Sequence, residues 1–580
     1  MSISSKIILM ILKKWKIAEP ITNQIKAQFS EIELVLLQLL VNRSLMQQEA
    51  IDEFLNPDWG EDVHDPYLFK DMAMAVDRIY RAIKMNELIC VYADYDADGV
   101  TGAVILVSSL RKLGAEVQVY LPHREREGYG INQAAVRYLA DKQVKLIITC
   151  DCGVANVEEI TLAASLGIDT IITDHHQAKE TLPPAVAIIH PSLPRENYPG
   201  KNLSGGATAY KLVQGLLSGG DCELGEKEKE VWEKWLLDLV AISLVADMVP
   251  LLGEARTLVK YGLVVLQKNR RLGLQKLIEV AGVNPELITT NTIGWQIAPR
   301  INAAGRMDHA NAGYQLLMSE DSCEAEELAR SLNLTNTERQ RVSEEMLQQA
   351  LEQVGKLKRS DYAVFTFMPE WPLGVVGLVA GKLVQKYNRP ALVMCAEGDN
   401  IVGSARSIPA LDLMQVLKET DQHLIKYGGH KQAAGYKMTK ANYEKFIKAF
   451  NKVARQHLKD KDLTPVLELD AELELAKTDW LVYEAVQKLE PTGQTNPIPL
   501  FALFDLEVVA INPVGSEGQH WRLQLRQGEV EKKFITFNAL QKGVDLKVGD
   551  KIDVAFEVGV NEWNGNRELQ LKIMDFKHHE

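Results

Sequence analysis

The sequence predicts an α/β protein with a mostly parallel sheet, a long connecting helix, a second smaller α/β unit and a C-terminal β-barrel. From residue 87 to 190, short apolar runs alternate with helical stretches, which is typical of a parallel sheet covered on both faces. A smaller set of such segments recurs between 360 and 455, after one long stretch of mixed charge and helical periodicity. Beyond about residue 465 short alternating strands dominate, as in a small barrel.

The bulk composition is that of an ordinary globular protein, with 46% hydrophobic and 25% charged residues. Because 580 residues exceed what one core supports, we expect about three to five domains. The six cysteines form no CxxC pair, which favours a reducing cytoplasm and argues against a zinc site or a disulfide framework. The net charge of −13 argues only weakly against a nucleic-acid binder, since metal-binding acids and a local basic groove are both compatible with it.

The N-terminal region, residues 1 to 75, is expected to be helical. Its run KIILMILKKW is too short to span a bilayer and precedes no cleavage-site pattern, so no membrane partner is expected. QIKAQFSEIELVLLQLLVNRS has apolar residues spaced near 3.6, whereas PDWGEDVHDPY contains Pro and Gly and is expected to be a loop. DMAMAVDRIYRAIKMNE is then a helix that leads into a domain spanning 76 to 250.

The strands expected in that domain are ELICVYA, AEVQVYLP, VKLIITC, IDTIITD and AVAIIHP. The first helix is expected to run from Val100 to Lys112 and to end at Gly114. INQAAVRYLADK and NVEEITLAASLG supply two more helices between the strands. This repeated β-α-β order predicts that the carboxyl ends of the strands lie on one edge of the sheet, where ligands bind in open α/β folds.

Acids and imidazoles follow three of these strands. They are Asp94, Asp96 and Asp98 in CVYADYDADGVT, Asp151 after VKLIITC, and Asp174-His175-His176 after IDTIITD. Singly, each has an ordinary explanation as a solvated acidic turn, a helix cap or a half-buried histidine. Together, carboxylates gathered at one edge repel one another unless a cation stands between them. Carboxylate oxygens with one or two imidazoles suit Mg²⁺ or Mn²⁺, and the imidazole favours Mn²⁺.

The next segment adds a further acid. LSGGATAYKLV is expected to be a glycine turn into a helix, and VWEKWLLDLVAISLVADMVPL a helix that is apolar on most sides and therefore buried. Asp247 lies near its end, and a buried Asp without a partner costs several kcal/mol or is protonated. A metal would resolve that cost; a cap or a salt bridge is the alternative.

Residues 251 to 356 are expected to be helical and to end in a connecting helix. IAPRINAAGRMDHA is broken by Pro and Gly, so Arg300, Asn302 and Arg306 are expected on a loop over a site. DSCEAEELARSLNLTNTERQRVSEEMLQQALEQVGK has the periodicity of one long helix, interpreted as a connector between domains. Earlier in the chain, YLPHREREGYG carries Arg124 and Arg126 after a strand, which alone is typical of a solvated basic loop.

A second α/β unit is expected from 357 to 460, with strands YAVFTF, RPALVMCAE and NIVGSARS around the helix VVGLVAGKLVQKY. In GGHKQAAG, Gly428 and Gly429 allow the backbone to come close to a ligand, with His430 directed at it. GSARS, by itself, is typical of an ordinary turn. From 465 to 577 about five alternating strands and the Asn564-Gly565 turn favour an OB fold. Side chains that could stack on or attract a single strand are Trp521, Phe534, Phe537 and Trp563 with Arg522, Arg526 and Lys533, although half of the aromatics are expected in the core.

The motifs DYDADG, the isolated Asp151, DHH and VADMVP resemble the four motifs of the DHH phosphoesterase superfamily. IAPRINAAGRM, GSARSI and GGHKQAAG narrow the resemblance to the RecJ branch, the single-strand-specific 5′→3′ DNA exonucleases, over nearly the whole chain. This resemblance implies a DHH catalytic domain at 76 to 250, a DHH-associated domain at 357 to 460 whose GGH faces the metal centre, and an OB-fold domain at 465 to 577 that grips the strand upstream.

The resemblance also implies roles for individual residues. Two Mn²⁺ or Mg²⁺ ions would be held by Asp96, Asp98, Asp151, His175 and Asp247, with Asp151 as the bridge. His176 would act beside the scissile phosphate as a donor or acid, and Asp94 as an outer acid. Ser404 and Arg406 would hold the 5′ phosphate and so set the direction. The complete substrate-binding set is Arg124, Arg300, Asn302, Arg306, Ser404, Arg406, Gly429 and His430.

Four positions depart from the patterns of the relatives. Tyr92 stands where manganese pyrophosphatases of the superfamily have a histidine, so one metal is expected to be held more weakly. In LEPTGQTNPIPLF, Thr492 and Thr495 replace an aromatic residue and a glycine. The hinge or the upstream DNA contact is therefore expected to differ from that of the relatives. His190 stands where Asn is usual.

The resemblance therefore implies a metal-dependent exonuclease that releases mononucleotides from single-stranded DNA in repair and recombination. It further implies a cytoplasmic monomer whose partners are single-strand-binding protein and a RecQ-type helicase. Two alternatives stay open: a DHH phosphodiesterase of short oligonucleotides or cyclic dinucleotides, and a non-catalytic DNA-binding relative. The OB-like tail argues against the first, and the intact acid and histidine set argues against the second.

Overall fold

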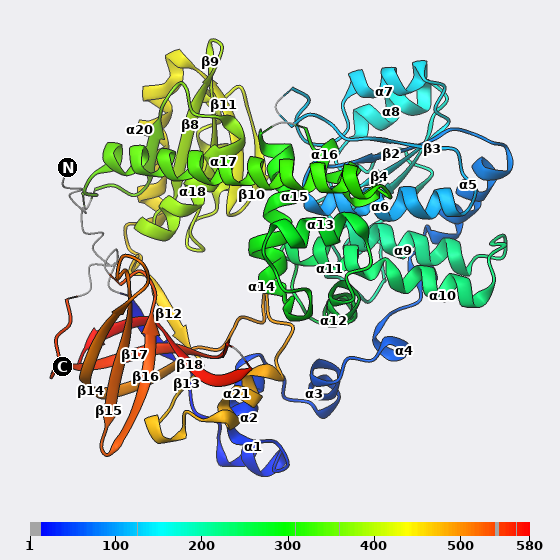
Figure 1. Cartoon of the computed structure of the whole chain (residues 1–580). Coiled ribbons are helices and arrows are strands. Elements are labelled where there is room, and N and C mark those ends of the chain that lie inside the picture. The colour runs from blue at the N-terminus through cyan, green and yellow to red at the C-terminus, as the bar shows by residue number, and fades with distance from the viewer. Residues whose placement is uncertain are drawn as a thin grey trace. The chain divides into compact units, whose positions relative to one another are not determined.

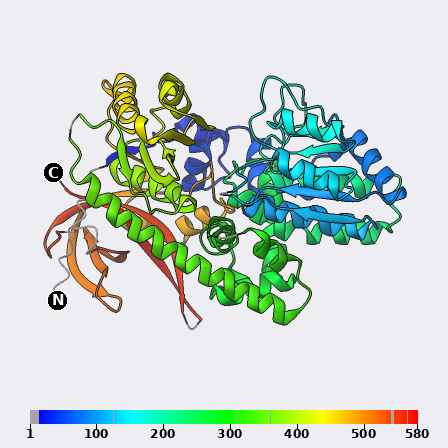
Figure 2. The same ribbon diagram turned by 90° about the horizontal axis from the view of Figure 1, so that it is seen from above.

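The computed structural model describes residues 13–124, 126–307, 309–358, 360–539, 545–563 and 565–579 (Figures 1 and 2). The chain forms two compact units. The large unit comprises Pro57–Gln385 and Arg389–Lys461, and the small unit comprises the described residues of Met1–Asn56, Lys386–Asn388 and Asp462–Glu580. Each unit is built around its own hydrophobic core.

The first sheet of the large unit has the strand order β3-β2-β4-β5-β6 and is parallel throughout, as predicted (Figure 1). Its strands are β2 (Ile89–Ala93), β3 (Val117–Tyr120), β4 (Leu146–Cys150), β5 (Asp169–Thr173) and β6 (Ala187–Ile189). Helices α5 (Met72–Lys84), α6 (Ala97–Lys112) and α9 (Gly205–Ser218) cover one face. Helices α7 (Gln133–Asp141) and α8 (Val157–Ser165) cover the other. Because both faces are covered, β2 and β4 are buried along their whole length.

Helix α6 begins at Ala97, three residues before the predicted start at Val100. The side chain of Asp96 caps it by accepting hydrogen bonds from the backbone N–H groups of Asp98 and Gly99. The first turn packs tightly on the end of β2, since a Cβ on Gly99 would lie 2.4 Å from the carbonyl oxygen of Asp94. Asp98 therefore lies in the first turn of a helix and not on a loop.

The apolar segment after α9 forms two helices and not one, α10 (Glu226–Trp235) and α11 (Leu237–Ala246). Only α11 is buried as predicted, and Asp247 is its C-terminal cap residue. The region that follows is helical as predicted, with α12 (Glu254–Gln267), α13 (Leu272–Val280), α14 (Thr290–Thr292), a π-helical turn η3 (Ile293–Ile297), α15 (Ala298–Met307) and α16 (Asn311–Met318).

The expected loop in IAPRINAAGRM was wrong, because this segment is helix α15. Pro299 lies in the first turn of α15, directly after the π-helical turn, where a missing N–H is tolerated. Gly305 serves close packing and not flexibility, because a Cβ there would lie 2.6 Å from the carbonyl oxygen of Tyr95. The helix is thereby fixed against the loop that follows β2.

Helix α17 (Ser322–Val354) is the predicted long helix, capped by Asp321. It is the long green helix of Figures 1 and 2 and leads to the second sheet, whose strand order is β10-β11-β9-β8-β7. This sheet comprises β7 (Val364–Phe367), β8 (Ala391–Glu397), β9 (Asn400–Arg406), β10 (Lys426–His430) and β11 (Ala433–Thr439), with α18 (Leu373–Tyr387), α19 (Leu413–Glu419) and α20 (Tyr443–Leu458). The strand expected in NIVGSARS is β9, which ends at Arg406 between β8 and β11, so GSAR lies in a strand and not in a turn.

The small unit contains the predicted OB barrel, closed by the pairing of β14 with β17. Its strands are β14 (Phe501–Val514), β15 (His520–Gln527), β16 (Val530–Thr536), β17 (Lys551–Trp563) and β18 (Asn566–His578). Phe534 is a core residue with 1% of its surface exposed, and Trp521 packs against the core. Asn564 and the side chain of Trp563 lie outside the described residues.

The N-terminal region is not wholly helical, because KWKI forms strand β1 (Lys14–Ile17) beside β12 (Val466–Leu469). Helices α1 (Asn23–Gln28), α2 (Leu34–Asn42) and α3 (Gln48–Leu55) share one core with the barrel and with α21 (Trp480–Gln487). Arg43 of this region donates to the side chain of Asn496, beside the two unusual threonines. The expected loop PDWGEDVHDPY contains two short helices, α4 (Trp59–Asp62) and η1 (Pro66–Leu68).

The described helices and cysteines bear on whether the chain has a membrane span or disulfide bonds. Among the described residues no helix is long and apolar enough to cross a membrane, and KIILMI lies outside them. The six cysteines, all in the described part of the chain, are free thiols.

Candidate metal centre

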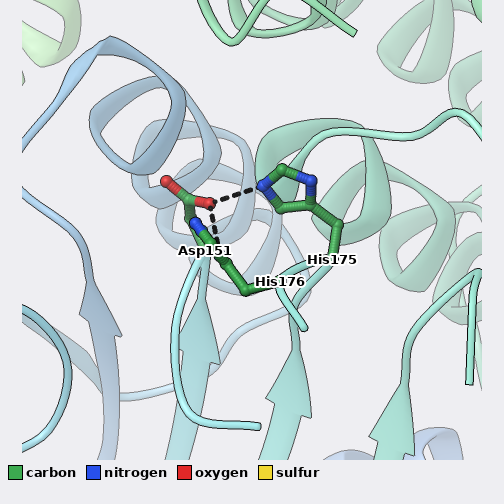
Figure 3. Close-up of side chains that lie close together, drawn as sticks. All are labelled: Asp151, His175 and His176. Carbon is green, nitrogen blue, oxygen red and sulfur yellow. Dashed lines mark hydrogen bonds and ion pairs between the residues drawn. The ribbon is translucent and has the colours of Figure 1, made fainter. Parts of the chain in front are cut away.

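The carboxyl ends of β2, β4 and β5 bring the predicted acids and histidines together. Nε2 of His175 lies 3.1 Å from Oδ1 of Asp151, 3.8 Å from Oδ2 of Asp98 and 3.5 Å from Oδ2 of Asp247. Figure 3 shows the carboxyl group of Asp151 directed at both imidazoles of the DHH motif. Three overlapping groups have ligand atoms within 4.8 Å of one another: Asp94, Asp96 and Asp151; Asp98, His175 and Asp247; Asp151, His175 and His176.

Asp98 is held by donors from a different part of the large unit. It accepts hydrogen bonds from the N–H groups of Gly205 and Gly206, at 2.7 and 2.8 Å, and from the hydroxyl of Ser243. Gly205 is required for this approach, because a Cβ there would lie 2.3 Å from Cβ of Asp151. Burial, followed by the charge of Asp96, still raises the pKa of Asp98 to about 6.

The other acids have fewer compensating donors. Burial and the charge of Asp98 raise the pKa of Asp151 well above its usual range, and the same two causes raise the pKa of Asp247 to about 8. Burial also raises the pKa of Asp94, whose buried Oδ1 has no hydrogen-bond partner among the described residues. This excess of buried negative charge, with oxygen and imidazole donors converging on it, fits divalent cations such as Mg²⁺ and Mn²⁺.

Asp174 is the acid of the DHH motif, and protein groups supply the hydrogen bonds that its carboxylate needs. Burial disfavours its charge, yet hydrogen bonds from Nδ1 of His176 and from the N–H groups of Val154 and His176 outweigh burial and lower its pKa to about 2. Conversely, burial disfavours the imidazolium of His176, but Asp174 raises the pKa of His176 to about 9. Burial lowers the pKa of His175 to about 3, so its imidazole is neutral and available to a metal.

Two residues at the site were missed or undervalued by sequence reasoning. The hydroxyl of Tyr129 donates to the carbonyl oxygen of Asp151 at 3.1 Å and lies 2.9 Å from Nδ1 of His176. The signal for Tyr129 is its place in GYG, between two glycines with φ of +81° and +83°. His190 donates from Nε2 to the carbonyl oxygen of His176 at 2.7 Å and accepts at Nδ1 from the N–H of Ser192. Its ring thus holds the backbone of the DHH motif.

Tyr92 lies apart from these ligand atoms. It is fully buried on the face of the sheet covered by α7 and α8, and its hydroxyl donates to the carbonyl oxygen of Gly130 at 3.1 Å. Its ring stacks on Tyr120. A side chain so committed offers no ligand at this position, so the weaker binding of one metal stays a prediction.

Arg124 and Arg306, from separate segments of the large unit, lie near the acids of the first motif, and Arg406 lies near both of these arginines. The guanidinium of Arg124 lies 4.9 Å from the ring centre of Tyr95, and Nη1 of Arg306 donates to the carbonyl oxygen of Gly374 at 3.2 Å. Nη1 of Arg406 donates to the hydroxyl of Ser404 at 2.9 Å. Burial, and then the charges of Arg124, Arg339 and Arg406 among its neighbours, lower the pKa of Arg306 to about 9.

The remaining predicted substrate residues differ in what they contact. Asn302 accepts a hydrogen bond from the N–H of Ala97 and so supports the first motif, whereas Arg300 donates to Asn333 of α17. The ring of His430 stacks at 6.3 Å on that of His176. Gly429 has φ of +149°, and a Cβ there would lie 2.3 Å from the carbonyl oxygen of Ala433, so glycine is needed for the β10–β11 hairpin.

A cavity of about 880 Å³ opens beside the histidines. His175, His176, His190, Asp247 and His430 line it, together with Lys179 and Arg195. The cavity therefore places basic and imidazole groups next to the carboxylates, as a phosphate-containing substrate requires.

Comparison with known proteins agrees with this geometry. The family models that match are the DHH family N-terminal domain at residues 88–244, the DHHA1 domain at 360–456 and the RecJ OB domain at 469–575. The single-stranded-DNA-specific exonuclease RecJ of Bacillus subtilis is 36% identical over 569 residues, which cover 97% of this chain and 70% of that protein. This chain belongs to the RecJ family.

Solved RecJ structures share its fold. RecJ of Thermus thermophilus in complex with Mn²⁺ is 27% identical with a TM-score of 0.82, and the match covers 98% of this chain and 80% of that one. The same protein in complex with Mg²⁺ is 26% identical with a TM-score of 0.75, covering 98% and 79%. The fold predicted from the RecJ resemblance is thereby confirmed: a parallel-sheet DHH domain, a DHH-associated domain and an OB barrel.

Proposed function

We propose that this chain hydrolyses single-stranded DNA from its 5′ end and releases 5′-mononucleotides. The observation that carries the proposal is a cluster of buried carboxylates at the sheet edge with arginines close to it, Arg306 near enough for the charge of Asp96 to favour its charged form. A phosphodiester needs both, since cations must neutralise its oxygens and fixed positive groups must hold its flanking phosphates. The names of the curated relatives, single-stranded-DNA-specific exonucleases, support the same reaction.

The proposed metal ligands are Asp96, Asp98, Asp151, His175 and Asp247. Asp151 and His175 each belong to two of the three ligand groups, and of the two Asp151 is proposed, from the RecJ resemblance, as the ligand that two ions would share. When bound, Mn²⁺ or Mg²⁺ would supply a hydroxide nucleophile near neutral pH and neutralise charge on the phosphoryl oxygens. The Thermus thermophilus relative is known in complex with each of these ions. Asp94, whose Oδ1 lacks a partner among the described residues, is proposed as an outer acid that adds to the negative field.

His176 holds a proton for the reaction. Its Nδ1 is engaged by Asp174, which keeps the imidazole protonated near neutral pH and leaves Nε2 to donate to the phosphate or the leaving 3′ oxygen. Tyr129 and His190 fix the ring and the backbone of the motif, respectively. These contacts orient the donor before substrate arrives, which reduces the reorganisation needed at the transition state.

Direction of attack follows from the arginines. Arg124, Arg306 and Arg406, with the hydroxyl of Ser404, are proposed to bind the phosphate at the 5′ end, because guanidinium groups bind phosphate bidentately. Arg300, Asn302, Gly429 and His430 complete the proposed substrate set through the helix and hairpin that border the site. The OB barrel is proposed to bind the strand beyond the active site.

The wider role is also proposed: repair and recombination in the cytoplasm, as a monomer, with single-strand-binding protein and a RecQ-type helicase as partners. The domain limits are likewise proposed as 1 to 75, 76 to 250, 251 to 356, 357 to 460 and 465 to 577. The core that the described residues up to 56 share with the barrel argues for grouping these residues with the last of these domains.

The decisive experiment uses single strands labelled at the 5′ or the 3′ end, incubated with the protein in Mn²⁺, in Mg²⁺ and in EDTA. We expect labelled mononucleotide at once from the 5′-labelled strand, a shrinking ladder from the 3′-labelled strand, and no product in EDTA. Cleavage of a dinucleotide but not of a long strand would instead favour the small-substrate phosphodiesterase. Strand binding without nucleotide release in either metal would favour a non-catalytic DNA-binding protein.

A further inference from the structure

The long helix α17 carries a polar interruption in its buried face. Its buried residues recur at intervals of three and four over most of its length: Ala325, Ala329, Leu332, Asn336, Ser343, Met346 and Ala350. Between Asn336 and Ser343 the same face is filled by Arg339, which is half-buried. A helix that only connects two domains would bury apolar residues at these positions. Two turns of the buried face of α17 are polar instead, which indicates that they contact a polar group.

Two buried polar atoms of this stretch lack hydrogen-bond partners among the described residues. Asn336 is only 2% exposed, and its Oδ1 accepts no hydrogen bond from any of them. Nε of Arg339 is also buried without a partner in the described part of the chain. Buried polar atoms are nearly always hydrogen-bonded, and an unpaired one costs about 1–3 kcal/mol, so such atoms point to a missing ligand.

Arg339 lies beside the arginines of the active site. Helix α15, which bears Arg306, packs along α17, and Nε of Arg300 donates to Oδ1 of Asn333 one turn before Asn336. Arg339 is near enough to Arg306 for its positive charge to disfavour the charged form of that side chain, as do Arg124 and Arg406. Guanidinium groups from three other segments therefore lie near that of Arg306, and the charge of Asp96 offsets only part of their repulsion.

Two glycines allow helix α18 to come close to this place. A Cβ on Gly377 of α18 would lie 3.1 Å from Nη2 of Arg406 and 3.1 Å from Oγ of Ser404, and a Cβ on Gly374 would lie 2.1 Å from the carbonyl oxygen of Arg306. The N-terminal part of α18 thus lies close to the arginines, and the positive end of its helix dipole adds to their field. A dianion suits such a field better than a singly charged diester.

We propose that Arg339 is a substrate-binding residue that, with Arg124, Arg306 and Arg406, takes the terminal phosphate of a 5′-phosphorylated single strand. This inference rests on the proposed function and assigns α17 a direct part in substrate recognition. The terminal phosphate carries more charge than an internal one, which matches the surplus of guanidinium groups. A strand with a 5′-hydroxyl end lacks this group and gains little from Arg339.

The test compares Arg339→Ala with Arg341→Ala. Arg341 lies two residues on, is exposed, and is paired with Glu338 and Glu345, so it controls for loss of charge on the same helix. Binding of fluorescent 5′-phosphorylated and 5′-hydroxyl strands is measured in EDTA by anisotropy, which requires no catalysis. The quantity of interest is the ratio of the two dissociation constants, because a partly misfolded sample changes both constants equally.

We expect wild type and Arg341→Ala to prefer the phosphorylated strand, and Arg339→Ala to lose about tenfold or more of that preference. Arg339→Lys should retain part of it, since charge remains but the bidentate geometry is lost. An unchanged ratio in Arg339→Ala would overturn the inference while leaving the proposed function intact. Failure of the wild type to bind either strand, or to degrade one in Mn²⁺, would overturn the proposed function and the inference with it.

Discussion

Two of the sites where the large unit buries charge differ in how that charge is compensated. Lys211 and Glu254 form a fully buried pair at 2.9 Å, and further hydrogen bonds from Tyr198 and to the carbonyl oxygen of His64 satisfy both groups. At the sheet edge, Asp98, Asp151 and Asp247 instead face one another.

The difference teaches how to distinguish a structural charge from a functional one. The Lys211–Glu254 pair is closed, because each charge has an opposite partner inside the protein, and breaking it should affect stability. The acids at the sheet edge are open, because the protein groups around them leave the pKa values of Asp151 and Asp247 raised, and changing these acids should affect activity. Asp174 shows that position in a motif does not decide the matter, since it is closed although it stands in DHH.

The largest expected effect is on activity at the open site. Asp151→Asn should lower the rate on single-stranded DNA by about 1000-fold or more, because one ligand of the metal centre is lost. Asparagine tolerates the φ of +61° at this position, so the backbone is preserved. Initial rates in Mn²⁺ measure the effect, with Asp141→Asn at the exposed end of α7 as the control. A rate within tenfold of wild type would remove Asp151 from the proposed ligands.

The closed pair should respond in the opposite way. Lys211→Met leaves Glu254 buried without its cation and should lower the free energy of unfolding by about 3–5 kcal/mol. The rate per folded molecule at 25 °C should stay within about twofold of wild type, since neither residue touches the metal centre. Urea unfolding followed by Trp fluorescence measures the first quantity, and Glu254→Gln added to Lys211→Met should recover part of the loss. A stable but inactive Lys211→Met protein would contradict the distinction.

Metal removal should make stability depend on pH at the open site. The pKa values of Asp98 and Asp247 are raised to about 6 and about 8 in the folded protein, from 3.8. Below about pH 4 both states are protonated; as the pH rises towards 8, the unfolded state ionises first, so folding is progressively disfavoured. In EDTA the melting temperature should therefore fall from pH 5 to pH 8 more steeply in wild type than in Asp247→Asn.

Bound Mn²⁺ should cancel this fall, so the melting-temperature gain from Mn²⁺ should grow between pH 5 and pH 8. Differential scanning fluorimetry at four or five pH values measures both curves. A gain that does not change with pH, together with parallel EDTA curves for wild type and Asp247→Asn, would show that the acids do not carry unfavourable charge.

The smallest expected effect concerns a neutral contact at the open site. Tyr129→Phe removes the hydroxyl between Asp151 and His176 and should lower kcat about three- to tenfold with KM little changed, as one hydrogen bond contributes about 0.5–1.5 kcal/mol. Steady-state kinetics on a 5′-phosphorylated strand provide the measurement. An equal change in KM would instead assign Tyr129 to substrate binding.

Much of the fold and of the acid cluster was predictable from the sequence. Parallel strands appear as buried apolar runs, and their carboxyl ends share one edge, so the residue order alone assigns Asp96, Asp98, Asp151 and His175 to one place. The long helix and the barrel strands were predictable for a related reason, because their periodicity is local.

The tertiary structure decided what local patterns do not encode. Packing against Tyr95 made IAPRINAAGRM a helix although Pro and Gly suggested a loop, and pairing with β12 made KWKI a strand. Contacts between segments distant in sequence brought Tyr129 to His176 and Gly205 to Asp98. The role proposed for Arg339 was not predictable, because Arg339 lies in a helix whose mixed charge is typical of a connector between domains. Whether a charge is closed or open depends on its neighbours in space, and only the folded chain determines those.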